Sequence, residues 1–196
     1  MTTVHIKRLS GEDLIPYIND LARLRIEVFR AFPYLYDGSV AYEKKYLQTY
    51  IDNPASVMVL ALDGDTVVGA STAIPMQYET MELKQPFIEQ GYDLEQVFYC
   101  SESVLNSQYR GLGIGVRFFE EREAHASSLG GFKHITFCCV ERPSNHPLKP
   151  VDYVSLERFW EKRGYLKHPE LHTTYCWKDV DRDEETPKPM TFWLKQ

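Results

Sequence analysis

The sequence predicts an α/β (α+β) domain in which helices flank a mostly antiparallel mixed sheet. The expected elements follow the order strand, two helices, two strands, short helix, strand, helix, strand, helix and two strands. Asp63-Gly64-Asp65 separates two β-rich segments, which is a strong hairpin signal. The 196 residues suffice for one hydrophobic core and show no internal repeat, so we expect a single domain over residues 1–196.

The first half of the chain is expected to hold three strands and up to three helices. Apolar residues recur at helical spacing from Leu14 to Val28, and Pro16 leaves the start of that helix open between Ser10 and Pro16. Gly91 is a typical residue for a helix stop. The expected ranges are strands at 4–9, 56–62 and 66–74, and helices at 12–30, 40–51 and 84–90.

The second half alternates strands and helices around an irregular loop that contains three prolines. The run at 134–140 is apolar throughout, which is typical of a central strand. Asp152 is a plausible N-cap for the last helix, and Gly164 is a plausible residue just after its end. The expected ranges are strands at 95–105, 134–140, 173–180 and 190–194, helices from the glycine loop to Leu129 and at 152–163, and the loop at 141–150.

Composition and charge argue against several classes of protein. The net charge is −6, and no basic stripe of a nucleic-acid-binding protein is visible. The sequence has no basic amphipathic helix that would indicate binding to a membrane surface, and no apolar run long enough to span a bilayer. The acidic balance suits a cationic substrate such as an amine, although many proteins are mildly acidic for solubility alone.

Four cysteines bear on the cellular compartment and on metal binding. No pair has C-x-x-C spacing, so we expect no zinc site and no other metal site. All four lie in apolar, strand-like runs, which predicts buried free thiols in a reducing compartment. The first ten residues lack the apolar region of a signal peptide, and a cytoplasmic location is expected. The four are Cys100, Cys138, Cys139 and Cys176.

Residues 110–115 read Arg-Gly-Leu-Gly-Ile-Gly between a strand and a helix. A glycine-rich turn at a helix start lets several backbone N–H groups converge on one anion. Gly113 and Gly115 lack the Cβ atoms that would keep a phosphate at a distance, and Arg110 can add a charge-assisted hydrogen bond. This segment, called the glycine loop below, predicts a phosphate site, although it could also be a simple turn that starts a helix.

Two other phosphate-binding motifs fit the glycine loop poorly. A Walker A loop requires Gly-Lys followed by Ser or Thr, which is absent. A Rossmann fingerprint requires a last glycine where Val116 stands, and its strand begins the domain rather than coming mid-chain. An ATP-binding domain therefore remains only a weak alternative.

The glycine loop resembles the acetyl-coenzyme A signature, Gln/Arg-x-x-Gly-x-Gly/Ala, of the GNAT (GCN5-related) N-acetyltransferase superfamily. Residues 156–165, with Phe159-Trp160 and Gly164-Tyr165, resemble the late helix and turn of that family. The two motifs occur in the expected order with one strand between them, and the order of elements resembles the GNAT fold over nearly the whole chain. The resemblance implies a GNAT-like fold and transfer of an acetyl group from acetyl-CoA to a primary amine of a small molecule or peptide by direct attack.

The resemblance also implies which residues contact the cofactor. The strand before the glycine loop should diverge from its neighbour and bind the pantetheine arm. Backbone N–H groups near Val104 are expected to stabilise the negative charge that develops on the reacting carbonyl oxygen. The implied pantetheine contacts are Ser103, Val104 and Leu105, and the implied pyrophosphate contacts are Arg110, Gly111, Leu112, Gly113, Ile114 and Gly115.

Two positions of the late helix depart from the family pattern. Tyr153 stands where an Asn often contacts the cofactor, and Trp160 stands where a Tyr often protonates the departing thiolate. We still assign both to the cofactor site by position. An indole N–H donates but does not ionise usefully, so Trp160 is a poor general acid. The general acid stays unassigned, and a non-catalytic acyl-CoA-binding or regulatory module on the same fold stays open as an alternative.

Glu102 is the predicted catalytic base, because a carboxylate within an otherwise apolar strand requires a role or a partner. A solvent-facing position or a structural salt bridge is an equally good interpretation. Strict alternation would place Cys100 on the same face as Glu102, with Ser101 and Ser103 on the other. Direct transfer requires no cysteine nucleophile.

Two further segments are expected near the acceptor. The run Phe32–Asp37 lies in a region that lines the acceptor site in related proteins, and the loop at 141–150 should overhang the same cleft. His146 in that loop is either a proton carrier or a surface histidine. The exposed edge of a closing strand also offers a surface for a homodimer.

Overall fold

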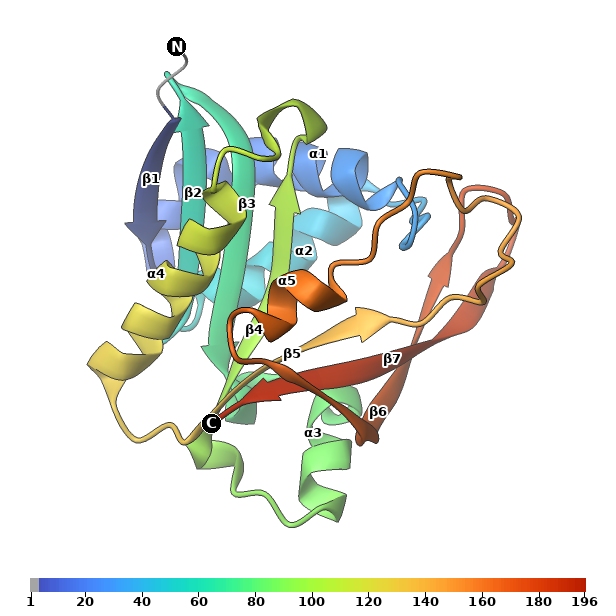
Figure 1. The fold of residues 1–196 in the computed structure, drawn as a ribbon. Helices are drawn as coiled ribbons and strands as arrows, with labels where there is room; N and C mark the ends of the chain where they lie inside the picture. Colours follow the sequence, from blue (N-terminus) through green and yellow to red (C-terminus); the bar gives the residue numbers. More distant parts are fainter. Residues whose placement is uncertain (1–3) are drawn as a thin grey trace.

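Seven strands form the central sheet of the computed structural model, which describes residues 4–196. They are β1 (Val4–Leu9), β2 (Val57–Asp63), β3 (Thr66–Pro75), β4 (Val97–Leu105), β5 (His134–Val140), β6 (Leu166–Lys178) and β7 (Glu185–Lys195). Their order across the sheet is β1-β2-β3-β4-β5-β7-β6, and β4 with β5 is the one parallel pair among the described strands. The predicted fold class, a mostly antiparallel mixed sheet with flanking helices, is confirmed (Figure 1).

Helices cover both faces of this sheet (Figure 1). A 3₁₀ segment at Gly11–Tyr17 leads into α1 (Ile18–Phe29), and α2 (Val40–Ile51), α3 (Met81–Glu89), α4 (Ile114–Leu129) and α5 (Glu157–Glu161) follow. One core lies between the sheet and α1, α2 and α3, and it includes Leu21, Leu47 and Phe87. The other lies under α4 and α5 and includes Phe118 and Phe119. The two cores define an α1 face and an α4 face of the sheet.

Several predicted boundaries differ from the structure. The predicted first helix begins as a 3₁₀ segment that contains Pro16, because a proline cannot donate the backbone hydrogen bond of a continuous α-helix. The predicted helix over 152–163 is only five residues long, and its N-cap is Leu156 rather than Asp152. Val151 and Val154 are fully or largely exposed, so no apolar face stabilises a helix there.

The closing strands β6 and β7 are longer than predicted, and α3 begins three residues earlier. The prediction that all four cysteines are buried was wrong for Cys176, whose side chain is exposed on β6. Cys139 is half-buried, and Cys100 and Cys138 are buried. An alternating edge strand can point one cysteine to solvent even within an apolar run.

The strands β4 and β5 diverge after a short parallel contact. Their pairing covers three positions and ends at Tyr99 opposite Thr136, whereas β5 continues alongside β7 as far as Val140 opposite Met190. The remainder of β4 therefore has a neighbour on its β3 side only. This opening, called the strand gap below, lies at the C-terminal ends of both strands and next to the glycine loop.

A β-bulge in β4 sits at the start of the strand gap. The register shifts between Thr72–Glu102 and Ile74–Tyr99, so β4 has one more residue than β3 across this interval. Side chains of the two residues of a bulge no longer alternate. Cys100 lies in the α4-face core, whereas Ser101 contacts Glu79 and Glu102 contacts Arg25 of α1. The expectation that Cys100 and Glu102 share a face was therefore wrong.

Candidate active site

The backbone of β4 presents alternate residues to the strand gap. The N–H of Asn106 donates to the carbonyl of Val68 at 2.9 Å. Hydrogen-bonded pairs in an antiparallel ladder recur at every second residue, so the backbone groups of Val104 also point to β3. Those of Ser103 and Leu105 then point into the gap. Of the three predicted pantetheine contacts, Ser103 and Leu105 thus offer backbone partners, while Val104 offers a buried side chain.

The glycine loop forms the first turn of α4 in a conformation that requires glycine at two positions. Gly111 and Gly113 have φ values of 79° and 80°, and a Cβ atom built on either would meet nothing within 4 Å. Backbone freedom, rather than a close neighbour, explains these glycines. Gly113 is also the N-cap residue of α4, and no side chain caps this helix start.

The loop leaves a cluster of backbone donors without partners. None of the backbone N–H groups from Gly111 to Gly115 has a hydrogen-bond acceptor within residues 4–196, whereas those of Val116 and Arg117 donate to the carbonyl of Gly113. Helix starts with free N–H groups and a partial positive charge attract anions. Arg110 is exposed beside them and forms no ion pair with a described residue.

Gly115 has a different role from the other two glycines. A Cβ atom on Gly115 would lie 3.3 Å from Cζ of Phe159, so this glycine allows α5 to pack against the first turn of α4. The sequence predicted that Gly115 keeps space for a phosphate. The nearest occupant of that space is the Phe159 ring, which ties the two motifs of the resemblance together.

Contacts from the preceding strands hold the glycine loop in place. The hydroxyl of Tyr109 donates to Oδ2 of Asp63 at 2.6 Å, at the end of β2. The backbone N–H groups of Tyr109 and Arg110 donate to the carbonyls of Asn106 and Ser107 in a single 3₁₀ turn. These bonds fix the start of the loop, while the backbone N–H groups of residues 111–115 stay available to a ligand.

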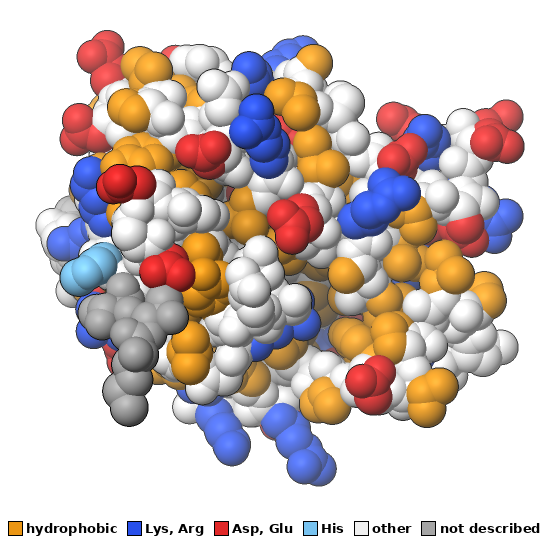
Figure 2. Space-filling view, turned by 90° about the horizontal axis from the view of Figure 1, so that it is seen from above, with side chains coloured by type: hydrophobic (Ala, Val, Ile, Leu, Met, Phe, Trp, Pro, Cys, Tyr) orange, Lys and Arg blue, Asp and Glu red, His pale blue; other side chains and the backbone are white. Residues whose placement is uncertain are grey.

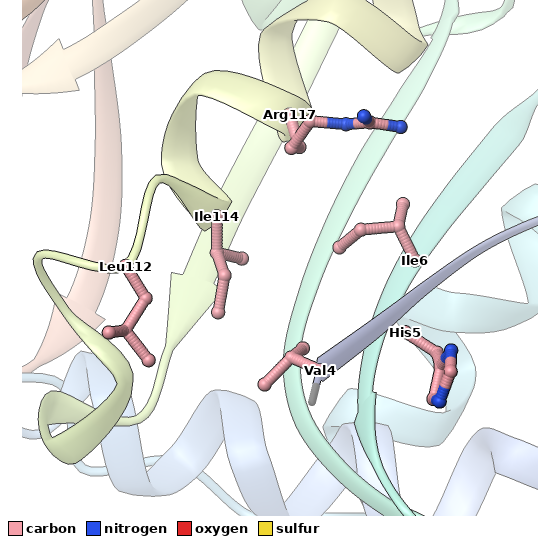
Figure 3. Close-up of a pocket in the computed structure, with 6 residues that line it drawn as sticks. All are labelled: Val4, His5, Ile6, Leu112, Ile114 and Arg117. Atoms are coloured by element: carbon pink, nitrogen blue, oxygen red, sulfur yellow. The ribbon is translucent and has the colours of Figure 1, made fainter. Parts of the chain in front are cut away.

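A cavity of about 490 Å³ lies beside the loop, between β1 and the start of α4 (Figure 3). Val4 and Ile6 face Leu112 and Ile114 across it, and Arg117 extends over one side (Figure 3). Leu112 is exposed, and Ile114 is buried. The cavity lies on the β1 side of the loop rather than in the strand gap, so we assign no part of the reaction to it.

Glu102 lies at the strand gap but is bound within a buried ion-pair cluster. Its carboxylate pairs with the guanidinium of Arg25, which also pairs with Glu43 of α2. Arg25 packs over the rings of Phe29 and Tyr46, and its side chain is 8% exposed. The cluster joins α1, α2 and β4, which is the structural salt bridge that the sequence left as an alternative for Glu102.

The structure brings Trp160 and Tyr153 to different places. Trp160 belongs to an aromatic cluster in which its ring meets those of Phe137 and Trp193 at centroid distances of 5.0 and 5.1 Å. Tyr153 lies in the loop before α5, with its ring edge against Phe32 at 4.7 Å. Trp160 is thus a packing residue of the α4 face, and Tyr153 connects the loop after β5 with the loop after α1.

Arg142 fastens the loop after β5 to the loop after α1. It donates to both carboxylate oxygens of Asp179 at 2.8 Å and to the backbone carbonyls of Pro33 and Tyr34 at 2.7 Å. Although burial pushes the pKa of Asp179 upward, the bonds from Arg142 hold it below its usual range. His146 packs near Phe32 at 5.8 Å and accepts a hydrogen bond from the N–H of Leu148. These two loops form one wall at the end of the sheet.

The face toward which β4 points is hollowed near its centre (Figure 2). Hydrophobic side chains surround the hollow, and Lys or Arg atoms are visible within it (Figure 2). Within residues 4–196, no group of three histidine, cysteine or acidic side chains is arranged to hold a metal ion. No helix in this part of the chain is both long and apolar enough to cross a bilayer.

Sequence reasoning missed Glu79, which lies in the turn after β3. This residue is buried, and the hydroxyl of Ser101 points to its Oε1 from 3.4 Å at the β-bulge. Burial raises the pKa of Glu79, and hydrogen bonds from Thr80 and Ser101 oppose that rise only in part. Its sequence context, Met-Gln-Tyr-Glu-Thr after Pro75, reads as an ordinary polar turn and gives no signal of burial.

Comparisons with known proteins agree with this geometry. Residues 21–165 match the sequence profile described as the Acetyltransferase (GNAT) family, which is more than half of the chain. No curated protein matches the chain by sequence.

Solved structures with a similar fold include three with informative descriptions. Arabidopsis thaliana NAA60 in complex with acetyl-CoA has a TM-score of 0.63 and 14% identity, and the match covers 98% of this chain and 97% of that one. Ribosomal-protein-alanine N-acetyltransferase from Brucella melitensis has a TM-score of 0.63 and 10% identity, with 97% and 98% covered. An aminoglycoside 6'-N-acetyltransferase complexed with coenzyme A has a TM-score of 0.59 and 19% identity, with 97% and 96% covered. Identities this low show a shared fold alone. The profile match, together with the glycine loop and the strand gap, shows that this chain belongs to the GNAT acetyltransferase family.

Proposed function

We propose that this protein transfers the acetyl group of acetyl-CoA to a primary amine of a small molecule or peptide. The observation that carries the proposal is the set of free backbone N–H groups at residues 111–115, placed after the end of β4, at the open end of the strand gap. A site for a diphosphate therefore adjoins an opening in the sheet whose edge can pair with an extended ligand. Two of the similar structures are described as complexes with acetyl-CoA or coenzyme A.

The residues present fit such a cofactor. Positive φ values at Gly111 and Gly113 turn the loop, and empty space lies beside both, so several N–H groups can face one anion. Arg110 adds a positive charge. The backbone of Ser103 and Leu105 is free to pair with the amides of the pantetheine arm, and Leu112 and Ile114 contribute mainly through their backbone. Trp160 and Tyr153 support the site through packing in this proposal.

Acetyl-CoA supplies an acetyl group that is activated as a thioester. The chain holds the reactants in line, and alignment alone can contribute several kcal/mol to catalysis, about 7–11 in favourable cases. The N–H groups of Ser103 and Leu105 are positioned to stabilise negative charge at the gap.

Glu102 stays a predicted base. Its carboxylate is at the gap, yet it would have to release Arg25 to take a proton. A guanidinium favours the charged form of a neighbouring carboxylate, which opposes proton uptake. Glu102→Gln tests this role directly: a large loss of turnover with unchanged binding of acetyl-CoA would support it.

The first experiment asks which nucleotide the glycine loop binds. Acetyl-CoA and ATP are compared by thermal shift, since a ligand that binds the folded state at 100 times its Kd stabilises it by about 2.7 kcal/mol. Stabilisation by acetyl-CoA with little effect of ATP is expected. Stabilisation by ATP alone would contradict the proposed function.

The second experiment asks whether the protein is catalytic. Release of free thiol from acetyl-CoA is followed with phenethylamine, spermidine and the tripeptide Ala-Ala-Ala as acceptors, and with 2-phenylethanol as a control that lacks the amine. Thiol release with an amine but not with the alcohol is expected. Binding of acetyl-CoA without release for any amine would favour a regulatory acyl-CoA-binding module. The cytoplasmic location and a homodimer stay predictions, to be checked by fractionation and by gel filtration.

A further inference from the structure

Four carboxylates are almost completely shielded from solvent on or near the α1 face of the sheet. Three of them have a cationic partner: Glu43 and Glu102 pair with Arg25, and Asp179 pairs with Arg142 and Lys188. Glu79 differs, because no lysine, arginine or histidine within residues 4–196 lies at ion-pairing distance from it. A buried carboxylate without a cation is costly, which makes Glu79 a candidate for binding a ligand.

Most neighbours of Glu79 are neutral. Burial raises the pKa of each nearby tyrosine, so their hydroxyl groups can donate hydrogen bonds but carry no charge. The titratable groups that face Glu79 are Tyr46 and Tyr50 of α2, Lys84 of α3, Tyr99 of β4, Cys138 of β5 and Tyr175 of β6. Lys84 is the one cation among these groups, and its ammonium donates to the carbonyl of Gln77 at 3.4 Å.

Glu79 also lies at the strand gap. Its oxygen contacts Ser101 at the β-bulge, two residues beyond the last β4–β5 pair. At the start of the gap, Tyr99 and Cys138 join β4 and β5 on the α1 face through a 3.1 Å contact between the hydroxyl and the thiol. Glu79 approaches from the α1 face, whereas the glycine loop begins the helix on the α4 face. A cofactor entering along α4 would leave the Glu79 side of the gap to the acceptor.

We propose that Glu79 receives the ammonium group of the acceptor and takes its proton before the amine attacks. This inference rests on the proposed function, assigns the acceptor subsite, and places the base at Glu79 instead of Glu102. One proton passes from the ammonium nitrogen to a carboxylate oxygen of Glu79. The neutral amine then forms the C–N bond as the C–S bond breaks, the second proton leaves with the sulfur as thiol, and Glu79 returns its proton to solvent.

The test compares three Glu→Gln variants that remove the same charge at different places. Glu79→Gln changes the proposed base, Glu102→Gln changes the residue bound to Arg25, and Glu89→Gln changes an exposed residue of α3 as the matched control. Thiol release is measured with whichever of phenethylamine, spermidine and Ala-Ala-Ala reacts with the wild type. General base catalysis contributes about 10²–10⁴-fold, so Glu79→Gln should lower kcat/KM for the amine by at least about 100-fold. Its thermal shift with acetyl-CoA should match that of the wild type, and Glu89→Gln should retain wild-type activity.

The pH profile distinguishes a base from a structural residue. The wild type should lose activity at low pH as Glu79 becomes protonated, and this acidic limb should disappear in Glu79→Gln. Near-wild-type turnover in Glu79→Gln, or a loss confined to Glu102→Gln, would overturn the inference while leaving the proposed function intact.

If the wild type releases no thiol, the proposed function is contradicted. A binding measurement then tests separately whether Glu79 forms an ammonium subsite. Stabilisation by phenethylamine is compared with that by 2-phenylethanol in the presence of CoA. An amine-specific shift in the wild type that is lost in Glu79→Gln supports the ammonium subsite. Equal shifts in both proteins, or none in either, overturn it.

Discussion

Gly115 lies directly under the ring of Phe159, so that any side chain on this glycine would press against α5. The contact joins the first turn of α4 to the aromatic cluster on the same face of the sheet, where Phe159 also packs against Phe119. The geometry of the glycine loop and the position of α5 are therefore coupled.

Replacing Gly115 by Val should destabilise the protein by about 1–3 kcal/mol, because the added methyl groups overlap the Phe159 ring. Urea denaturation measures the loss. In a Phe159→Ala background the same substitution should cost much less, since the obstacle is gone, and a double-mutant cycle isolates the coupling. An equal cost in both backgrounds would show that Gly115 serves another purpose.

Replacing Gly113 by Ala should weaken both folding and cofactor binding. A residue with a Cβ atom pays about 1–2 kcal/mol in the left-handed region that Gly113 occupies at a φ of 80°. Gly91→Ala is the matched control, since Gly91 has a φ of 76°, an equally open surrounding and no part in the site. Both variants should lose thermal stability, but only Gly113→Ala should lose part of its stabilisation by acetyl-CoA. Equal stabilisation of the two would contradict the assignment of the loop.

Removing Arg25 should be strongly destabilising. Arg25→Met leaves Glu43 and Glu102 buried without their cation, and breaking such a cluster from one side costs about 3–5 kcal/mol. The triple variant Arg25→Met, Glu43→Gln and Glu102→Gln should recover much of the loss, because no buried charge is left unpaired. Denaturant titrations of both variants measure the free energy of unfolding. If the triple variant does not recover stability, packing of Arg25 on Tyr46 and Phe29 is the main source of the loss.

Glu79 should make stability depend on pH in a defined direction. Burial raises its pKa in the folded protein above that of the unfolded chain, so folding binds a proton between those two values. The contribution of Glu79 is most favourable below the unfolded pKa and is lost as pH rises through the folded one. The free energy of unfolding of Glu79→Gln should therefore rise relative to wild type as pH is raised from about 4.5 toward neutrality. A pH-independent difference between the two proteins would contradict this account.

The sequence was sufficient for the fold class and for the helix start after the glycine loop because their signals are local. Residues 110–115 lie next to one another, and their spacing alone indicated a helix start that can bind an anion. The hairpin at Gly64 and the apolar strand at 134–140 were likewise readable from neighbouring residues, and both are confirmed.

The contacts at the strand gap on the α1 face could not be predicted in the same way, because their residues are distant in sequence. Glu79 meets Ser101 only after β3 and β4 pair, and Arg25 meets Glu102 only after α1 packs on the sheet. An argument from strict alternation could not foresee the β-bulge, and it therefore placed Cys100 and Glu102 on the same face. The role of Gly115 depends on Phe159, a partner supplied by a helix more than forty residues later.

The extra residue in β4 decides which face of the sheet each later side chain of this strand occupies. With it, Ser101 and Glu102 both turn toward the α1 face, and every later residue of β4 lies on the face opposite to the one that simple alternation would assign. A deletion of one residue between Tyr99 and Glu102 would turn Val104 toward the wrong core and present the other set of backbone amides to the strand gap. In this strand, lengthening or shortening by a single position would be more damaging than most substitutions.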